Sequence, residues 1–140
     1  MSEQKYVLDT MVVSALRLPA RNPEVAAWAA AKALTSLYVA TPTFAEIKRG
    51  ILRLQQVDPG AAARIGNWFE HNVLAAFATR TLDFDTKAAL RLATYPVPDR
   101  APLNDALIAA IAESNDMVIA TRNVKHFTPL GVQYIDPWHP

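Results

Sequence analysis

The sequence contains no cysteine. This absence excludes disulfides, thiolate metal sites and cysteine nucleophiles, and it is compatible with a reducing compartment. Any metal ion would therefore need oxygen or imidazole ligands. The chain also lacks an excess of charge of either sign, because 14 Lys and Arg residues stand against 13 Asp and Glu residues, a formal net charge of +1. A polyanionic partner would have to be held by a local basic patch.

Long hydrophobic runs are absent as well. The alanine-rich segment 25–37 is the best candidate for a membrane span, but it carries Lys32 and is too short to cross a bilayer. The first five residues are polar, and no apolar segment of the kind found in secretory signals follows them. We therefore expect no membrane partner and a cytoplasmic location.

The residues that are present suffice for one sizeable core, since 51% of the 140 residues are hydrophobic. Residues 1–140 are accordingly predicted to form a single domain. Short apolar runs predict strands at 6–8, 37–40 and 117–120, with a short strand at 81–82 and an edge strand at 132–135. Helices are predicted at 23–34, 43–56, 61–71 and 85–93, and from residue 104 onward. This alternation predicts an α/β fold with a parallel sheet covered on both faces.

Three carboxylates stand near the predicted strand ends. Asp9 ends the first strand, Glu46 follows the second strand, and Asp105 opens the helix that precedes the strand at 117–120. In open α/β sheets, ligands bind beyond the carboxyl ends of the strands. Three carboxylates that converge there could not all stay ionised without a cation, and Mg²⁺ or Mn²⁺ favours such oxygen ligands.

Each carboxylate also has an ordinary structural explanation. Asp9 could cap the helix that follows it. Glu46 lies three residues after Thr43, which is the spacing of a capping box, and it could pair with Arg49. The helix dipole favours Asp105 in a first turn, but the neighbours of Asp105 at i+3, i+4 and i+7 are apolar. It should thus face protein, where an uncompensated charge is costly.

The order and context of these segments resemble the PIN-domain family, specifically its VapC- and FitB-like toxin ribonucleases, over nearly the whole chain. Four segments carry the resemblance: residues 6–16 (YVLDTMVVSAL), 43–51 (TFAEIKRGI), 105–110 (DALIAA), and 120–124 (ATRNV) with 129–132 (PLGV). The resemblance implies a three-layer α/β/α fold whose central parallel sheet has about four to five strands. It also implies that Asp9, Glu46 and Asp105 are the catalytic metal ligands.

The activity that the resemblance implies is that of a metal-dependent endoribonuclease, the toxin of a toxin–antitoxin pair. Such an enzyme hydrolyses RNA phosphodiester bonds with Mg²⁺ or Mn²⁺ as cofactor. The expected partners are RNA, a cognate antitoxin protein and a second copy of the chain in a homodimer. Candidate substrate-binding residues are Thr10, Thr121, Arg122 and Arg49.

The sequence departs from the family pattern at two places. Met11 stands where relatives commonly have asparagine, and Asn123 and His126 stand at the two positions where relatives carry a fourth acid. Asn123 is a further candidate metal contact. The departures leave open an alternative, a non-catalytic PIN domain that binds RNA or a protein partner. A response-regulator receiver is disfavoured, because Asp9 has no adjacent acid and no matching lysine is evident.

Overall fold

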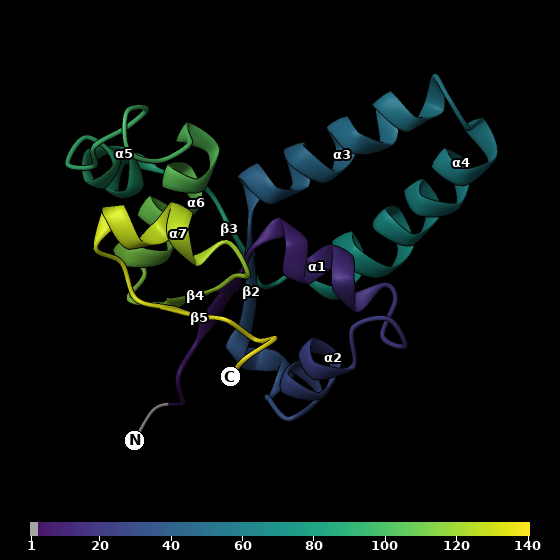
Figure 1. The fold of residues 1–140 in the computed structure, drawn as a ribbon, viewed down its shortest axis with the longest axis horizontal. Coiled ribbons are helices and arrows are strands. Elements are labelled where there is room, and N and C mark those ends of the chain that lie inside the picture. The colour runs from purple at the N-terminus through teal and green to yellow at the C-terminus, as the bar shows by residue number, and fades with distance from the viewer. Residues whose placement is uncertain (1–2) are drawn as a thin grey trace.

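The computed structural model describes residues 3–140, so Met1 and Ser2 of the polar N-terminal segment lie outside the described residues. Five parallel strands form the central sheet in the order β3-β2-β1-β4-β5. Figure 1 shows this sheet between two groups of helices. The strands are β1 (Tyr6–Leu8), β2 (Leu37–Ala40), β3 (Thr81–Leu82), β4 (Val118–Ala120) and β5 (Tyr134–Ile135). The predicted parallel sheet is confirmed, and β5 is the predicted edge strand, although it begins two residues later than expected.

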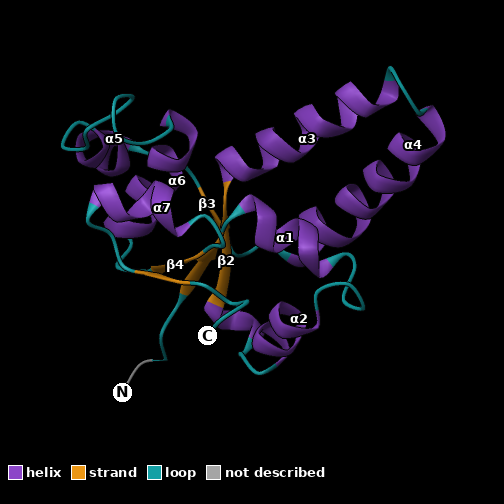
Figure 2. Cartoon of the chain, in the orientation of Figure 1, coloured by secondary structure: helices purple, strands orange, loops and turns teal. Residues whose placement is uncertain are grey.

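Helices cover both faces of the sheet (Figure 2). The helices α1 to α4 lie on one side and α5 to α7 on the other, and α3 and α4 pack together as a pair that extends away from the sheet (Figure 1). Their bounds are α1 (Thr10–Leu16), α2 (Pro23–Ala30), α3 (Thr41–Gln55), α4 (Pro59–Trp68), α5 (Thr86–Leu92), α6 (Leu103–Ser114) and α7 (Val124–Phe127). A π-helical segment, Phe69–Leu74, continues α4. Within residues 3–140, none of the helices has both the length and the apolar character needed to cross a membrane.

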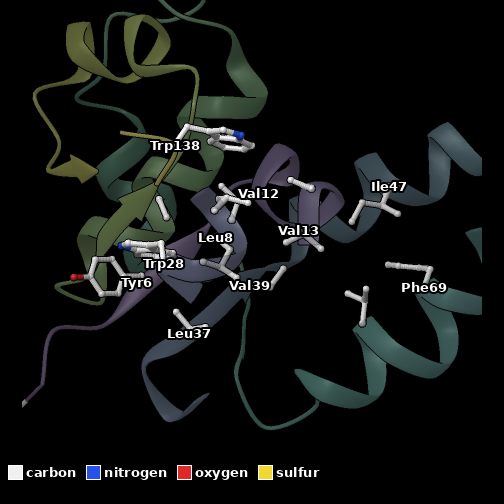
Figure 3. Close-up of a cluster of buried hydrophobic side chains, with 14 of the residues drawn as sticks. Tyr6, Leu8, Val12, Val13, Trp28, Leu37, Val39, Ile47, Phe69 and Trp138 are labelled. Carbon is white, nitrogen blue, oxygen red and sulfur yellow. The ribbon is translucent and has the colours of Figure 1, made fainter. Parts of the chain in front are cut away.

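The side chains of β1 alternate between two cores. Tyr6 and Leu8 pack in the cluster on the α1–α4 side, whereas Val7 packs in the cluster on the α5–α7 side. Figure 3 shows the first cluster, in which Leu8 and Val39 of the central strands lie between Trp28 at one end and Phe69 at the other. Successive strand residues point to opposite faces of the sheet, so the three buried residues of β1 pack against the helices on both sides. The predicted three-layer α/β/α arrangement is therefore confirmed.

The predicted start of helix α3 is wrong. Helix α3 begins at Thr41 and not at Thr43, because Pro42 fits the first helical turn, where its missing N–H is not needed. Thr43 is consequently inside the helix and fully buried, so it cannot act as the cap of a capping box with Glu46. Arg49 is exposed and, in the part of the chain that the structure describes, forms no ion pair with Glu46.

Candidate metal centre

Three elements bring the predicted carboxylates to one edge of the sheet. Asp9 directly follows β1, Glu46 lies in the helix that begins after β2, and Asp105 lies in the first turn of α6, which packs against α3, β1 and β2. The charges of Asp105 and Glu46 both raise the pKa of Asp9. The three groups, far apart in the sequence, therefore interact electrostatically beyond the carboxyl ends of the central strands.

Asp9 is held from two sides. Its Oδ1 accepts a hydrogen bond from the backbone N of Thr10 at 2.8 Å, and its Oδ2 accepts one from Thr121 Oγ1 at 2.8 Å. The first bond confirms that Asp9 is the N-cap of α1. Only 3% of Asp9 is exposed, and this burial raises its pKa to about 6 against the lowering effect of the two hydrogen bonds. A nearby cation would relieve the cost of the buried charge.

Glu46 is oriented by a residue that sequence reasoning missed. Its Oε1 accepts a hydrogen bond from Asn104 Nδ2 at 2.8 Å. Asn104 stands next to Asp105 in the first turn of α6, so one helix start supplies both an acid and the group that positions another acid. The only signal in the sequence was its adjacency to Asp105.

Asp105 lies against His126 of α7. The Oδ2 of Asp105 is 2.9 Å from Nδ1 of His126, and the side chain of Asp105 is 13% exposed. Burial raises the pKa of Asp105, and the charge and proximity of His126 partly offset this rise. The predicted protein-facing position of Asp105 is confirmed, because Ile108, Ala109 and Ala112 on its side of the helix are fully buried.

The remaining predicted residues surround these acids. Thr121 is fully buried, and its Oγ1 accepts a hydrogen bond from the backbone N of Asn123 at 3.0 Å. The side-chain amide of Asn123 lies 3.1 Å from the sulfur of Met11, so two positions that depart from the family pattern contact each other. The guanidinium of Arg122 stacks over Trp138 at 4.7 Å from the ring centroid.

A groove of about 480 Å³ runs beside the acids. Its wall includes Thr10, Met11, Glu46 and Arg122, and much of the rest is apolar. Asp9 and Asp105 do not line it, so the groove borders the acidic centre and is not centred on it. Arg49 does not line it either.

The donor types of the centre, carboxylate oxygen and imidazole nitrogen, are ones that a divalent ion accepts. In residues 3–140 no three histidine or acidic side chains are grouped closely enough to hold an ion together. Glu46 is bonded to Asn104, and Asp105 lies against His126. Mg²⁺ or Mn²⁺ would nevertheless satisfy the buried carboxylate of Asp9, whose pKa is raised, and the solvent-shielded Nδ1 of His126, which lies near Asp105 but makes no aligned hydrogen bond.

Comparison with known proteins identifies the fold family. Residues 6–128 match the family model described as PIN domain, and the chain belongs to that family. The plasmid stability protein StbB of Pseudomonas syringae is 36% identical over 137 residues, covering 94% of this chain and 97% of that protein. The VapC ribonuclease Y4jK of Sinorhizobium fredii is 32% identical over 141 residues, covering 96% and 98%.

A solved structure agrees with this assignment. The crystal structure of FitAcB from Neisseria gonorrhoeae superimposes with a TM-score of 0.85 at 29% identity, covering 96% of this chain and 99% of that chain. The DNA-bound VapBC structure from Salmonella typhimurium has a TM-score of 0.70 at 21% identity, which supports the fold alone. The resemblance to the PIN-domain family that the sequence indicated is confirmed.

Proposed function

We propose that this protein is an Mg²⁺- or Mn²⁺-dependent endoribonuclease and the toxin of a toxin–antitoxin pair. The observation that carries the proposal is the placement of Asp9, Glu46 and Asp105 on elements that pack together beyond the strand ends of a PIN domain, where burial and the neighbouring carboxylates raise the pKa of Asp9. Relatives with the names VapC ribonuclease and toxin FitB support it. We assign residues 1–140 to one PIN domain.

The proposed mechanism divides the work among the residues of the centre. Asp9, Glu46 and Asp105 would hold the ion, with Asn123 as a candidate further contact. A bound Mg²⁺ or Mn²⁺ supplies activation of a water and neutralisation of charge on the scissile phosphate. Thr121 and Thr10 N–H fix the carboxylate of Asp9, and Asn104 fixes that of Glu46, so the ligands are positioned before the ion binds.

RNA would approach along the groove beside the acids. Arg122 lies on its wall and is held against Trp138, so it can contact a phosphate without first losing much side-chain freedom. Thr10 offers a hydroxyl group on the wall of the groove. Thr121 is fully buried, and its hydroxyl is already bonded to Asp9 and to the backbone N of Asn123, so it would act on RNA only through Asp9. Arg49 is exposed on α3 and would act only on more distant phosphates.

The proposed antitoxin partner is supported by the relatives. Neighbouring structures include a toxin–antitoxin complex from Klebsiella pneumoniae at 20% identity. We propose that this chain is likewise bound by a cognate antitoxin. We also propose a homodimer, which the family resemblance implies and the exposed apolar side chains permit. A cytoplasmic location is part of the proposal, because the proposed RNA substrate is found there.

A non-catalytic PIN domain is the second candidate. It is favoured by the contact between Met11 and Asn123, which places a thioether and an amide where relatives have a polar group and an acid. Such a protein would still bind RNA or a protein partner through the groove.

Cleavage of RNA separates the two candidates. Purified protein is incubated with a panel of structured RNAs in Mg²⁺ or Mn²⁺, and the products are resolved on sequencing gels. We expect discrete cuts that EDTA and the Asp9→Asn substitution both abolish. Asp83→Asn, which changes an exposed acid, is the matched control and should cut as the wild type does. Cleavage that persists in Asp9→Asn, or no cleavage by the wild type, would favour the non-catalytic candidate.

A further inference from the structure

His126 has a buried nitrogen without a good partner. Its Nδ1 is shielded from solvent and makes no aligned hydrogen bond, although Asp105 Oδ2 lies 2.9 Å away. A buried polar atom in this state costs free energy unless something else satisfies it. The nitrogen therefore faces the acidic centre, and the described residues do not give it a well-aligned hydrogen-bond partner.

The separation of the two atoms fits shared coordination. Two ligand atoms at about 2.1 Å from one ion, and at right angles as in octahedral geometry, are about 3 Å apart. The observed 2.9 Å between Nδ1 of His126 and Oδ2 of Asp105 is close to that value. An ion could bind both atoms with little movement of either side chain.

The local fold explains why His126 and not Asn123 takes this place. Asn123 is the N-cap of α7, and its side-chain amide is directed to the sulfur of Met11. The backbone N of His126 donates to the carbonyl of Asn123 at 2.9 Å, which turns the chain and brings the imidazole over Asp105. An imidazole thus occupies the region from which a fourth acid would act.

We infer that His126 binds the catalytic ion through Nδ1, so that this chain holds its metal with three carboxylates and one imidazole. The inference rests on the proposed function, because it concerns the ion proposed there. An imidazole in place of a carboxylate shifts preference away from Mg²⁺ and toward transition metals. The protein should therefore bind Mn²⁺ in preference to Mg²⁺.

The direct test is pulsed electron paramagnetic resonance of the untagged protein with Mn²⁺ alone as the probe. The protein carries ¹⁵N only in its histidines. We expect a ¹⁵N hyperfine coupling typical of a directly bound imidazole, lost in His126→Asn and kept in His139→Asn, whose histidine is largely exposed. A wild-type spectrum without ¹⁵N coupling, or a coupling that survives His126→Asn, would overturn the inference.

Calorimetric titration provides a second readout. For the wild type, the ratio of the Mg²⁺ to the Mn²⁺ dissociation constant measures its preference for Mn²⁺. In His126→Asp this ratio should fall at least about tenfold, because a carboxylate replaces the imidazole, while Mg²⁺ still binds. Retained Mg²⁺ binding also shows that this variant is folded. An unchanged preference would mean that His126 is only the ion-pair partner of Asp105.

The outcomes distinguish this inference from the proposed function. Mn²⁺ binding that needs Asp9 but shows no ¹⁵N coupling refutes the role of His126 and leaves the nuclease proposal intact. Clear ¹⁵N coupling without RNA cleavage confirms the ligand and refutes the nuclease. If the wild type binds no Mn²⁺, both are wrong.

Discussion

At the scale of single residues, Asp9 dominates the electrostatics of the centre. Burial raises its pKa from 3.8 to about 6, since the loss of solvent outweighs two hydrogen bonds and the charges of Asp105 and Glu46 add to the rise. The folded chain thus binds this proton more tightly than the unfolded chain does. The stability that Asp9 contributes is fully present below about pH 4 and is lost as the pH rises through about 6.

Replacement of Asp9 by asparagine should therefore stabilise the metal-free protein at neutral pH. A shift of roughly two pKa units corresponds to about 3 kcal/mol, and the weaker contact with Thr121 offsets about 1 kcal/mol. In urea unfolding with EDTA, Asp9→Asn should exceed the wild type by about 1–3 kcal/mol at about pH 7.5. The advantage should vanish near pH 4.

The exposed Asp83 provides the matched control. Asp83→Asn should leave the free energy of unfolding nearly unchanged at both pH values. A difference between Asp9→Asn and the wild type that does not change with pH would contradict the assignment of a raised pKa to Asp9.

Single residues also mark where sequence reasoning ends. The place of Asp9 after a strand and before a helix left two roles open, a helix cap and a metal ligand at the strand ends, and the structure shows the cap. The contact of Asn104 with Glu46 spans 58 positions, and it depends on how α6 packs against α3. No local pattern encodes such a packing angle, so the partners of Glu46 and Asp105 became visible only in the structure.

At the scale of elements, α6 links the core to the centre. Its side chains Ala106, Ile108, Ala109, Ile111 and Ala112 are fully buried, whereas Leu103 at its start is 52% exposed. Asp105 therefore lies in the first turn of a helix whose remaining turns are held in place by buried side chains. Packing of this face determines where the carboxylate lies.

Truncation within α6 should be costly. Ile111→Ala should lower the free energy of unfolding by about 2–5 kcal/mol, because it removes buried methyl groups and leaves a cavity. Leu90→Ala on α5, where the side chain is 71% exposed, should change it by less than about 0.5 kcal/mol. Equal effects of the two substitutions in urea unfolding would contradict the assigned burial.

Element positions were largely predictable, and the errors have physical causes. Short apolar runs located each strand to within two residues, because fully buried parallel strands need continuous apolar sequence. The predicted start of α3 is two residues too late because the prediction places Pro42 before the helix. A proline is equally compatible with the first helical turn, which is where Pro42 lies. Similarly, α4 begins at Pro59, with Asp58 as its cap, and not at residue 61.

At the scale of the whole molecule, the proposed homodimer needs an apolar surface. Several large apolar side chains are exposed, among them Leu52, Val57, Leu90 and Leu103. We predict that light scattering at micromolar concentration gives twice the chain mass of 15.4 kDa. A monomeric mass throughout that range would contradict the dimer, and it would leave the metal centre unaffected.

The account depends most on one claim, that Asp9, Glu46 and Asp105 form a single metal site. Anomalous diffraction from crystals grown with Mn²⁺ tests it directly. The account predicts a manganese peak about 2.0–2.6 Å from carboxylate oxygens of these residues. A structure with saturating Mn²⁺ and no such peak, or with any two of these carboxyl groups more than about 10 Å apart, would contradict it.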